Sequence, residues 1–389
     1  MNSSASTEKI RELLKLENLN VDESFLKPDK GRFLKALNLE EADRITWFEY
    51  NMMQRIVDHV LGVRQPYQNL DAIDRIEFLN RTCASDSLLQ FVIWTWGGNL
   101  IHQLISSVEV IRASEEWDKT HNLYEPKQIA TSIEDRPVKS WSDLHELELY
   151  RENFDALVKI KVNGVKECIE AVKGTNIGVA ATVRSVLQQT YLTLGLTRFS
   201  KMLYTDRAMV EHIMDVYMDY KVKITEAVSE LPIDFFIIDD DMGHDGGPFI
   251  SPKLMEDLWY PRTERILKPL KRKGIPITFH TDGKVDKVIP LAIDLGIKGI
   301  HPIQPNCNDI YEYKKRWGDE ICLIGNIDIS GVLAFGTPGE VEKDVKEHID
   351  RLADPPGYVV KSSHSITDAV PPENFIAALR AVLKYGVCK

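Results

Sequence analysis

The sequence predicts an α/β protein folded as a (β/α)8 TIM barrel with an N-terminal helical extension. The first observation is a set of apolar runs that each end in polar residues, as residues 275–283 end in His280, Asp282 and Gly283. Such a run is typical of a buried parallel strand whose carboxyl end carries chemistry. The second is that strands and helices alternate at short intervals in the second half of the chain. The third is that no G-x-G-x-x-G motif follows a strand, which favours a barrel over a dinucleotide-binding sheet.

Residues 1–30 are expected to form the helical extension and linker, and residues 31–389 a single barrel domain. In the first half of the chain, the spacing of apolar residues and the turn residues between them predict the elements. They are helices at 32–37 and 47–61, a strand at 88–96, a β-ribbon at 108–130, a helix at 151–172, a strand at 177–183, and helices at 186–203 and 206–230.

The second half alternates more regularly, and each predicted strand is followed by a helix. The expected pairs are strand 235–239 with helix 252–273, 276–280 with 284–295, 299–303 with 309–316, 321–325 with 338–352, and 358–361 with 371–385. If these strands lie parallel in one sheet, their polar ends meet on one rim.

Composition limits the partners and the compartment. The chain of 389 residues is 43% hydrophobic, which is enough for a large core, and its net charge of −11 comes from 59 acidic and 48 basic residues. No basic cluster predicts nucleic-acid binding, and no apolar run predicts a signal peptide or a membrane span. The five cysteines include no C-x-x-C pair, which is typical of a reducing compartment. We therefore expect a soluble, cytoplasmic protein.

The predicted rim carries the candidate catalytic residues Asp240, Asp241, His280 and His364. Three adjacent carboxylates at 239–241 repel one another, so one is expected to bond a backbone group or an arginine while Asp240 or Asp241 faces the mouth. His280 is interpreted either as a ligand-binding residue or as a barrel histidine bonded to a neighbouring strand end. His364 lies among serines that could form a purely hydrogen-bonding site.

A second group of residues is predicted to bind the substrate. His244 belongs to a glycine-rich loop that could cover the site or simply form a turn. The tryptophans are candidates for an aromatic pocket, although core packing is an alternative. The full set is Trp94, Trp96, His244, His301, Gln304, Asn326 and Asp328.

Several short motifs, in their order and spacing, resemble the uroporphyrinogen decarboxylase superfamily. They include Arg32-Phe-Leu-Lys-Ala-Leu, Asp240-Asp-Met-Gly, His280-Thr-Asp-Gly, Gly325-Asn-Ile-Asp and Pro371-Pro-Glu-Asn. The resemblance implies a (β/α)8 barrel from one of two branches: cofactor-free decarboxylases of uroporphyrinogen III, or methyltransferases that work with thiols and corrinoid proteins, usually through zinc. The decarboxylase branch carries a Met-Arg-Gln-Ala-Gly-Arg segment that binds the substrate's carboxylates, and this sequence lacks such a segment. The methyltransferase branch is therefore favoured.

The resemblance also implies a metal site. The methyltransferase branch binds zinc through a His-x-Cys pair and a further cysteine ten residues before the asparagine of a Pro-x-Glu-Asn motif. The matching residues in this chain are His280, Asp282 and His364, so the thiolates are replaced by nitrogen and oxygen donors. Such donors still suit Zn²⁺ and leave a position for an oxygen ligand. The decarboxylase branch, however, has a metal-free histidine at the position of His364.

These features predict a methyltransferase that moves a methyl group from a small methylated substrate, with an O-methyl compound as one candidate, to a corrinoid protein through this metal. The expected partners are the small-molecule substrate and the corrinoid protein, with a homodimer as the candidate assembly. A metal-free lyase that uses the Asp cluster and His364 for proton transfer is the first alternative. A non-catalytic barrel that binds a small molecule is the second.

Overall fold

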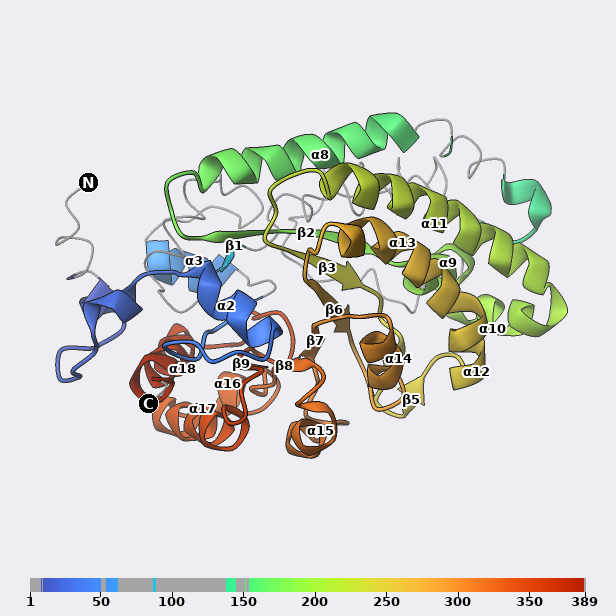
Figure 1. The fold of residues 1–389 in the computed structure, drawn as a ribbon. Helices are drawn as coiled ribbons and strands as arrows, with labels where there is room; N and C mark the ends of the chain where they lie inside the picture. The colour runs from blue at the N-terminus through green and yellow to red at the C-terminus, as the bar shows by residue number, and fades with distance from the viewer. Residues whose placement is uncertain are drawn as a thin grey trace.

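A parallel sheet forms the centre of the protein (Figure 1). The computed structural model describes residue 8 and residues 10–49, 54–61, 87–88, 138–144, 151 and 154–387. Seven strands of this sheet pair in parallel in the order β1-β2-β3-β6-β7-β8-β9. Their bounds are β1 Ser87–Leu88, β2 Gly178–Arg184, β3 Phe235–Asp239, β6 Ile277–Thr281, β7 Gly299–Pro302, β8 Cys322–Ile324 and β9 Tyr358–Val359.

Helices connect successive strands and cover the outside of the sheet, and Figure 1 shows α8, α11 and α13 along one side of β2 and β3. Their order confirms the alternation that the sequence predicts. The helical elements are η1 Glu23–Leu26, α2 Lys30–Leu37, α3 Gln54–Leu61, η3 Trp141–Leu144, α8 Phe154–Ala171, α9 Val186–Leu194, α10 Leu196–Thr205, α11 Arg207–Val228, α12 Pro252–Leu254, the π-helical turn η4 Met255–Trp259, α13 Tyr260–Arg272, α14 Ile289–Asp294, α15 Ile310–Trp317, α16 Val332–Phe335, α17 Pro338–Leu352 and α18 Pro372–Tyr385. A small hairpin, β4 Gly243–His244 with β5 Gly247–Pro248, follows β3.

An eighth segment extends the sheet beyond β9. Trp47 forms a parallel bridge with Val360, the Phe48 N–H donates to the Val360 carbonyl at 2.9 Å, and the Val360 N–H donates to the Thr46 carbonyl at 3.1 Å. The sequence predicts a helix from residue 47, but only 54–61 is helical within the described part of that range. Residues 46–48 therefore run beside the end of β9 as an additional strand-like segment.

The sheet curves around an apolar cluster to which strands near both of its ends contribute. Side chains from β2, β3, β8 and β9 pack together with α2 and Phe48. Within this cluster the ring of Phe33 lies 4.8 Å from that of Phe48 and 4.7 Å from that of Phe235, measured between centroids. Because strands far apart in the sheet order contact one core, the sheet has the curvature of the predicted barrel. A pairing between residues 44–49 and β1, which would close it, is not among the pairings of the described residues.

The N-terminal segment packs against the barrel, because Leu14 and Leu16 are fully buried in the main core. Residues 10–13 of this segment are helical and lie within the predicted helical extension. One further element of the N-terminal half differs from the sequence-based expectation. The predicted helix 186–203 is divided into α9 and α10 at Gly195, whose φ of +81° is incompatible with a continuous helix. The division of the chain at residue 30 stays a prediction. Among the described residues, no helix is both long and apolar enough to span a membrane.

Candidate metal centre

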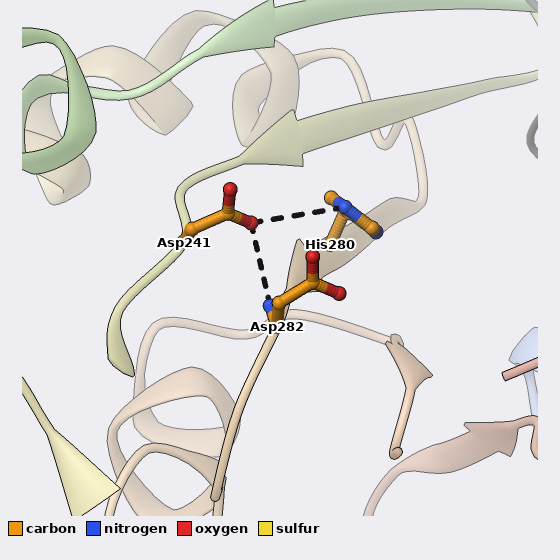
Figure 2. Close-up of side chains that lie close together, drawn as sticks. All are labelled: Asp241, His280 and Asp282. Atoms are coloured by element: carbon orange, nitrogen blue, oxygen red, sulfur yellow. Dashed lines mark hydrogen bonds and ion pairs between the residues drawn. The ribbon is translucent and has the colours of Figure 1, made fainter. Parts of the chain in front are cut away.

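Three side chains that can bind a metal converge at the carboxyl ends of β3 and β6. Asp241, His280 and Asp282 each contribute one potential ligand atom, and these atoms lie within 4.8 Å of one another (Figure 2). β3 and β6 are neighbouring parallel strands in which Asp239 pairs with His280, so residues just beyond the end of β3 lie beside the end of β6. The parallel register therefore brings together carboxylates that are far apart in the sequence.

Asp241 is oriented by the side chain of Gln188, near the start of α9. The Gln188 amide Nε2 donates to Asp241 Oδ2 at 2.5 Å, and the Asp241 N–H donates to Gln188 Oε1 at 3.2 Å. The other carboxylate oxygen, Oδ1, faces the cluster, 3.9 Å from His280 Nε2. Burial, and then the negative charges of Asp282 and Asp239, raise the pKa of Asp241 well above its usual value. A cation between Asp241 and Asp282 would relieve this repulsion.

Asp282 presents an unpaired carboxylate oxygen. Its Oδ1 is buried and has no hydrogen-bond partner among the described residues, whereas Oδ2 lies 3.5 Å from His364 Nε2. Burial acts to raise the pKa of Asp282, but the bond with His364 and the nearby His280 outweigh it, so the pKa is lowered. An ionised, buried oxygen without a partner is costly, and a bound cation would supply the missing interaction.

The strand end that carries Asp282 is held in place by the residues around it. Gly283 has a φ of +85°, and a Cβ there would come within 2.6 Å of backbone atoms in the β4–β5 hairpin. Its N–H donates to Gln304 Oε1 at 2.7 Å. Gln304, predicted to bind substrate, therefore supports the turn beside Asp282.

His280 is buried and contacts a second histidine. Its Nδ1 lies 3.2 Å from Nδ1 of His301, whose side chain is fully buried on the neighbouring strand β7. Burial lowers the pKa of both imidazoles, which keeps them neutral and able to bind metal. The sequence predicts that His301 binds substrate, but its contacts place it behind His280.

His364 lies on the open side of Asp282. Its side chain is 45% exposed, and its hydrogen bond with Asp282 raises its pKa. The sequence predicts a metal set of His280, Asp282 and His364. In the structure Asp241 completes the compact group with His280 and Asp282, and His364 contacts it through Asp282. The role of His364 as a direct ligand stays a prediction.

The carboxylate of Asp240 points away from this cluster. It accepts hydrogen bonds from the N–H groups of Gln188 (2.6 Å) and Leu187 (3.1 Å) at the start of α9, and from Trp259 Nε1 (2.9 Å). Burial raises its pKa to about 7, against the opposing effect of these bonds. These contacts support a structural role, anchoring α9 and η4, in place of the predicted catalytic one.

The other predicted substrate-binding residues have varied surroundings. Asn326 is buried and bonds the Ile303 carbonyl and His348 Nε2, so its side chain is turned toward α17. Asp328 accepts from the Ser330 N–H, and exposed His244 accepts from the Gly246 N–H within the hairpin. Trp94 and Trp96 lie outside the described residues.

Sequence reasoning missed several residues that support the cluster. Gln188 gives no signal in the sequence, because an isolated glutamine in a helix normally faces solvent. Arg184, at the end of β2, pairs with Asp239 at 3.4 Å. Glu49 and Lys361 form a buried ion pair at 3.3 Å. The polar ends of strands 178–184 and 358–361 were the signals that could have identified Arg184 and Lys361.

The donors at the cluster fit a divalent metal. Asp239 and Glu49 are each paired with a basic side chain, whereas the described contacts of the Asp241 and Asp282 carboxylates are with imidazoles and with side-chain or main-chain amides. Two carboxylates and one neutral imidazole are suitable ligands for Zn²⁺ or a harder divalent ion, with a coordination position left for substrate. The unpaired oxygen of Asp282 is the observation that favours a cation over a purely hydrogen-bonded site.

Comparison with known proteins agrees with the fold. A solved structure of a methyltransferase from Methanosarcina mazei superposes with a TM-score of 0.63 over 91% of this chain and 97% of its own, at 16% identity. The uroporphyrinogen decarboxylase of Pseudoalteromonas atlantica is 25% identical over 199 residues, which span 49% of this chain and about half (53%) of that relative. The one from Pseudoalteromonas translucida is 22% identical over 262 residues, or 65% of this chain and 71% of the relative. The family model described as uroporphyrinogen decarboxylase (URO-D) matches residues 124–385, more than half of the sequence. The chain therefore belongs to the uroporphyrinogen decarboxylase family.

Proposed function

We propose that the chain is a metal-dependent methyltransferase that removes a methyl group from a small, O-methylated compound and passes it to a corrinoid protein. The observation that carries the proposal is the convergence of Asp241, His280 and Asp282 with a buried, unpaired oxygen on Asp282. When bound there, a divalent metal would supply Lewis acidity to an oxygen of the substrate. The likeness to a protein described as a methyltransferase supports the choice of branch.

The residues of the chain would each do a distinct part of this work. Asp241, held by Gln188, and Asp282, held through Gly283, would fix the metal on one side of the substrate oxygen. His364, on the exposed side of Asp282, would donate a hydrogen bond from its ring to that oxygen as the methyl group leaves. The C–O bond would break with its electron pair staying on oxygen, and the reduced acceptor would supply the pair for the new bond to carbon.

The hydroxyl or ether oxygen is the substrate group that this donor set favours. Thiolate ligands suit zinc sites that activate a thiol, whereas carboxylate and imidazole ligands leave a metal with harder character that prefers oxygen. The absence of a Met-Arg-Gln-Ala-Gly-Arg segment also argues against a substrate rich in carboxylates, such as a porphyrinogen. These two arguments favour an uncharged methyl ether.

The competing function is decarboxylation, which the names of the curated relatives favour. One experiment separates the two. Purified protein loaded with Zn²⁺ is incubated anaerobically with 2-methoxyphenol and free cob(I)alamin, and separately with uroporphyrinogen III. The proposal predicts methylcobalamin in the first reaction and no coproporphyrinogen in the second, with Asp282→Asn inactive in the first. Coproporphyrinogen without methylcobalamin would overturn it.

A further inference from the structure

A buried ion pair joins Glu49, which follows the strand-like segment, to Lys361, which follows β9. The side chains of Glu49 and Lys361 are each 1% exposed, and Lys361 Nζ lies 3.3 Å from Glu49 Oε1. Taking two opposite charges out of water is costly, and such pairs are weak sources of net stability. Lys361 comes shortly before His364 in the segment that follows β9, and this position points instead to a role in the geometry of the site.

Ser362 connects this ion pair to His364. Its Oγ lies 2.8 Å from Glu49 Oε1 and 2.7 Å from Glu49 Oε2, and it also lies within hydrogen-bond distance of the main-chain carbonyl of His364. The single hydroxyl proton is therefore shared between the carboxylate and this carbonyl. The contact with the carbonyl closes a tight turn from Ser362 to His364, and Glu49 fixes the hydroxyl that closes it.

The backbone around this turn is anchored on its other side as well. Lys361 Nζ donates to the Ser362 carbonyl at 3.0 Å, and the Ser363 N–H donates to the Ile327 carbonyl at 2.8 Å. The His364 ring, in contrast, is nearly half exposed, and its contact with Asp282 at 3.5 Å directs it toward the metal centre. A shift of the turn would move the ring away from Asp282, because the packing on its exposed side is incomplete.

We propose that Glu49 and Ser362 are positioning residues that hold the His364 turn, and thereby keep His364 Nε2 against Asp282. The consequence for catalysis rests on the proposed function, because it assigns His364 to the substrate oxygen. The positioning itself is a property of the folded chain and can be tested without metal or substrate.

Ser362→Ala is the test variant, and Ser363→Ala is its matched control. Both serines are buried next to one another, but the Ser363 hydroxyl accepts a hydrogen bond from the Ile329 N–H and makes no described bond with His364. Diethyl pyrocarbonate is applied to the metal-free proteins, and the modification rate of each histidine is followed by mass spectrometry. Exposed His244 serves as the internal reference.

We expect His364 to be modified several-fold faster in Ser362→Ala than in wild type, with His244 unchanged and with Ser363→Ala equal to wild type. Ser362→Thr, which keeps the hydroxyl, should restore the slow rate. If Ser362→Ala does not fold, Ser362→Cys takes its place, because its side chain has nearly the same volume as serine but a much weaker hydrogen-bond donor. We expect His364 to be modified faster in this variant as well. Equal His364 rates in wild type, Ser362→Ala and Ser362→Cys would overturn the proposal, as would an equal increase in Ser363→Ala.

A titration with Co²⁺ separates this inference from the proposed function. If the positioning role and the proposed function are both correct, Ser362→Ala should weaken Co²⁺ binding by about tenfold, as the loss of supporting contacts around a metal site typically does. A changed His364 rate in a protein that binds no Co²⁺ would support the positioning role and contradict the proposed function. Tight Co²⁺ binding with an unchanged His364 modification rate would support the proposed function and contradict the positioning role.

Discussion

His280 and His301 meet through their Nδ1 atoms, which lie 3.2 Å apart inside the barrel. Only one of the two atoms can carry the proton of this hydrogen bond when both imidazoles are neutral. If Nδ1 of His280 carries it, the lone pair on its Nε2 is directed toward Asp241, on the side where a metal would bind. His301 would then fix both the tautomer and the ring orientation of His280, as groups behind a metal-binding histidine commonly do.

The first prediction concerns this contact. His301→Leu removes the acceptor for His280 Nδ1–H and should weaken Zn²⁺ binding by about 10- to 100-fold. His301→Asn places an amide near the same position and should retain more of the affinity. Competition with a chromophoric chelator measures both. Affinities equal to wild type in the leucine variant would show that His301 only fills space.

The second prediction concerns the repulsion between Asp241 and Asp282. Asp241→Asn removes one of two neighbouring, partly buried carboxylates that repel each other, so we expect the metal-free protein to become more stable, by roughly 1 kcal/mol. The same variant should lose most of its metal affinity. Urea denaturation of the metal-free protein, with and without added Zn²⁺, tests both effects, and a loss of stability without metal would contradict the assignment.

The third prediction separates Asp240 from its neighbour. Asp240→Asn presents an amide to three hydrogen-bond donors, two of them at the start of α9, and should cost about 1–3 kcal/mol of unfolding free energy. Metal content should not change, because the carboxylate faces away from the cluster. If Asp240→Asn loses metal while keeping its stability, Asp240 belongs to the metal centre and does not anchor α9.

The sequence was a good guide to the strands and to part of the site. Apolar runs that end in polar residues identified the ends of β3 and β6, and hence Asp241, His280 and Asp282. A strand pattern, however, does not say which side of the backbone faces the mouth when two carboxylates are adjacent. Asp240 and Asp241 therefore looked alike, although only Asp241 faces His280.

Other features depend on contacts that a linear pattern does not contain. Gln188 forms a hydrogen bond with Asp241, more than fifty residues away in the sequence, and Glu49 forms one with Ser362, more than three hundred residues away. His301 and Asn326 follow apolar strand residues just as His280 does, but neighbouring helices and strands provide their hydrogen-bond partners inside the protein. The strand-like character of residues 46–48 could not be predicted, because the apolar residues from Trp47 onward have helical spacing.

The fourth prediction concerns acid stability at the contact between α17 and α18. Hydrogen bonds from Lys384, and with them Tyr385 and Arg380, lower the pKa of Glu342 from 4.5 to about 2. Because the pKa is lower in the folded protein, the stabilisation is complete above pH 4.5 and is lost as the pH falls toward 2.

Wild type and Glu342→Gln should therefore differ in unfolding free energy near pH 6, by on the order of 1 kcal/mol for a partly exposed network. The difference should shrink steadily below pH 4.5. Chemical denaturation at a series of pH values measures it. A difference in unfolding free energy that stays constant down to pH 3 would mean that Glu342 has the same pKa in the folded and unfolded chain.

The most direct test of the metal centre is the metal content of the protein itself. Wild type, His280→Ala, Asp282→Asn and Asp240→Asn are loaded with Zn²⁺, desalted, and measured by inductively coupled plasma mass spectrometry. A metal centre at the ends of β3 and β6 predicts one zinc per chain in wild type and in Asp240→Asn, and almost none in His280→Ala and Asp282→Asn. Zinc absent from wild type, or present equally in all four proteins, would contradict a metal centre formed by Asp241, His280 and Asp282.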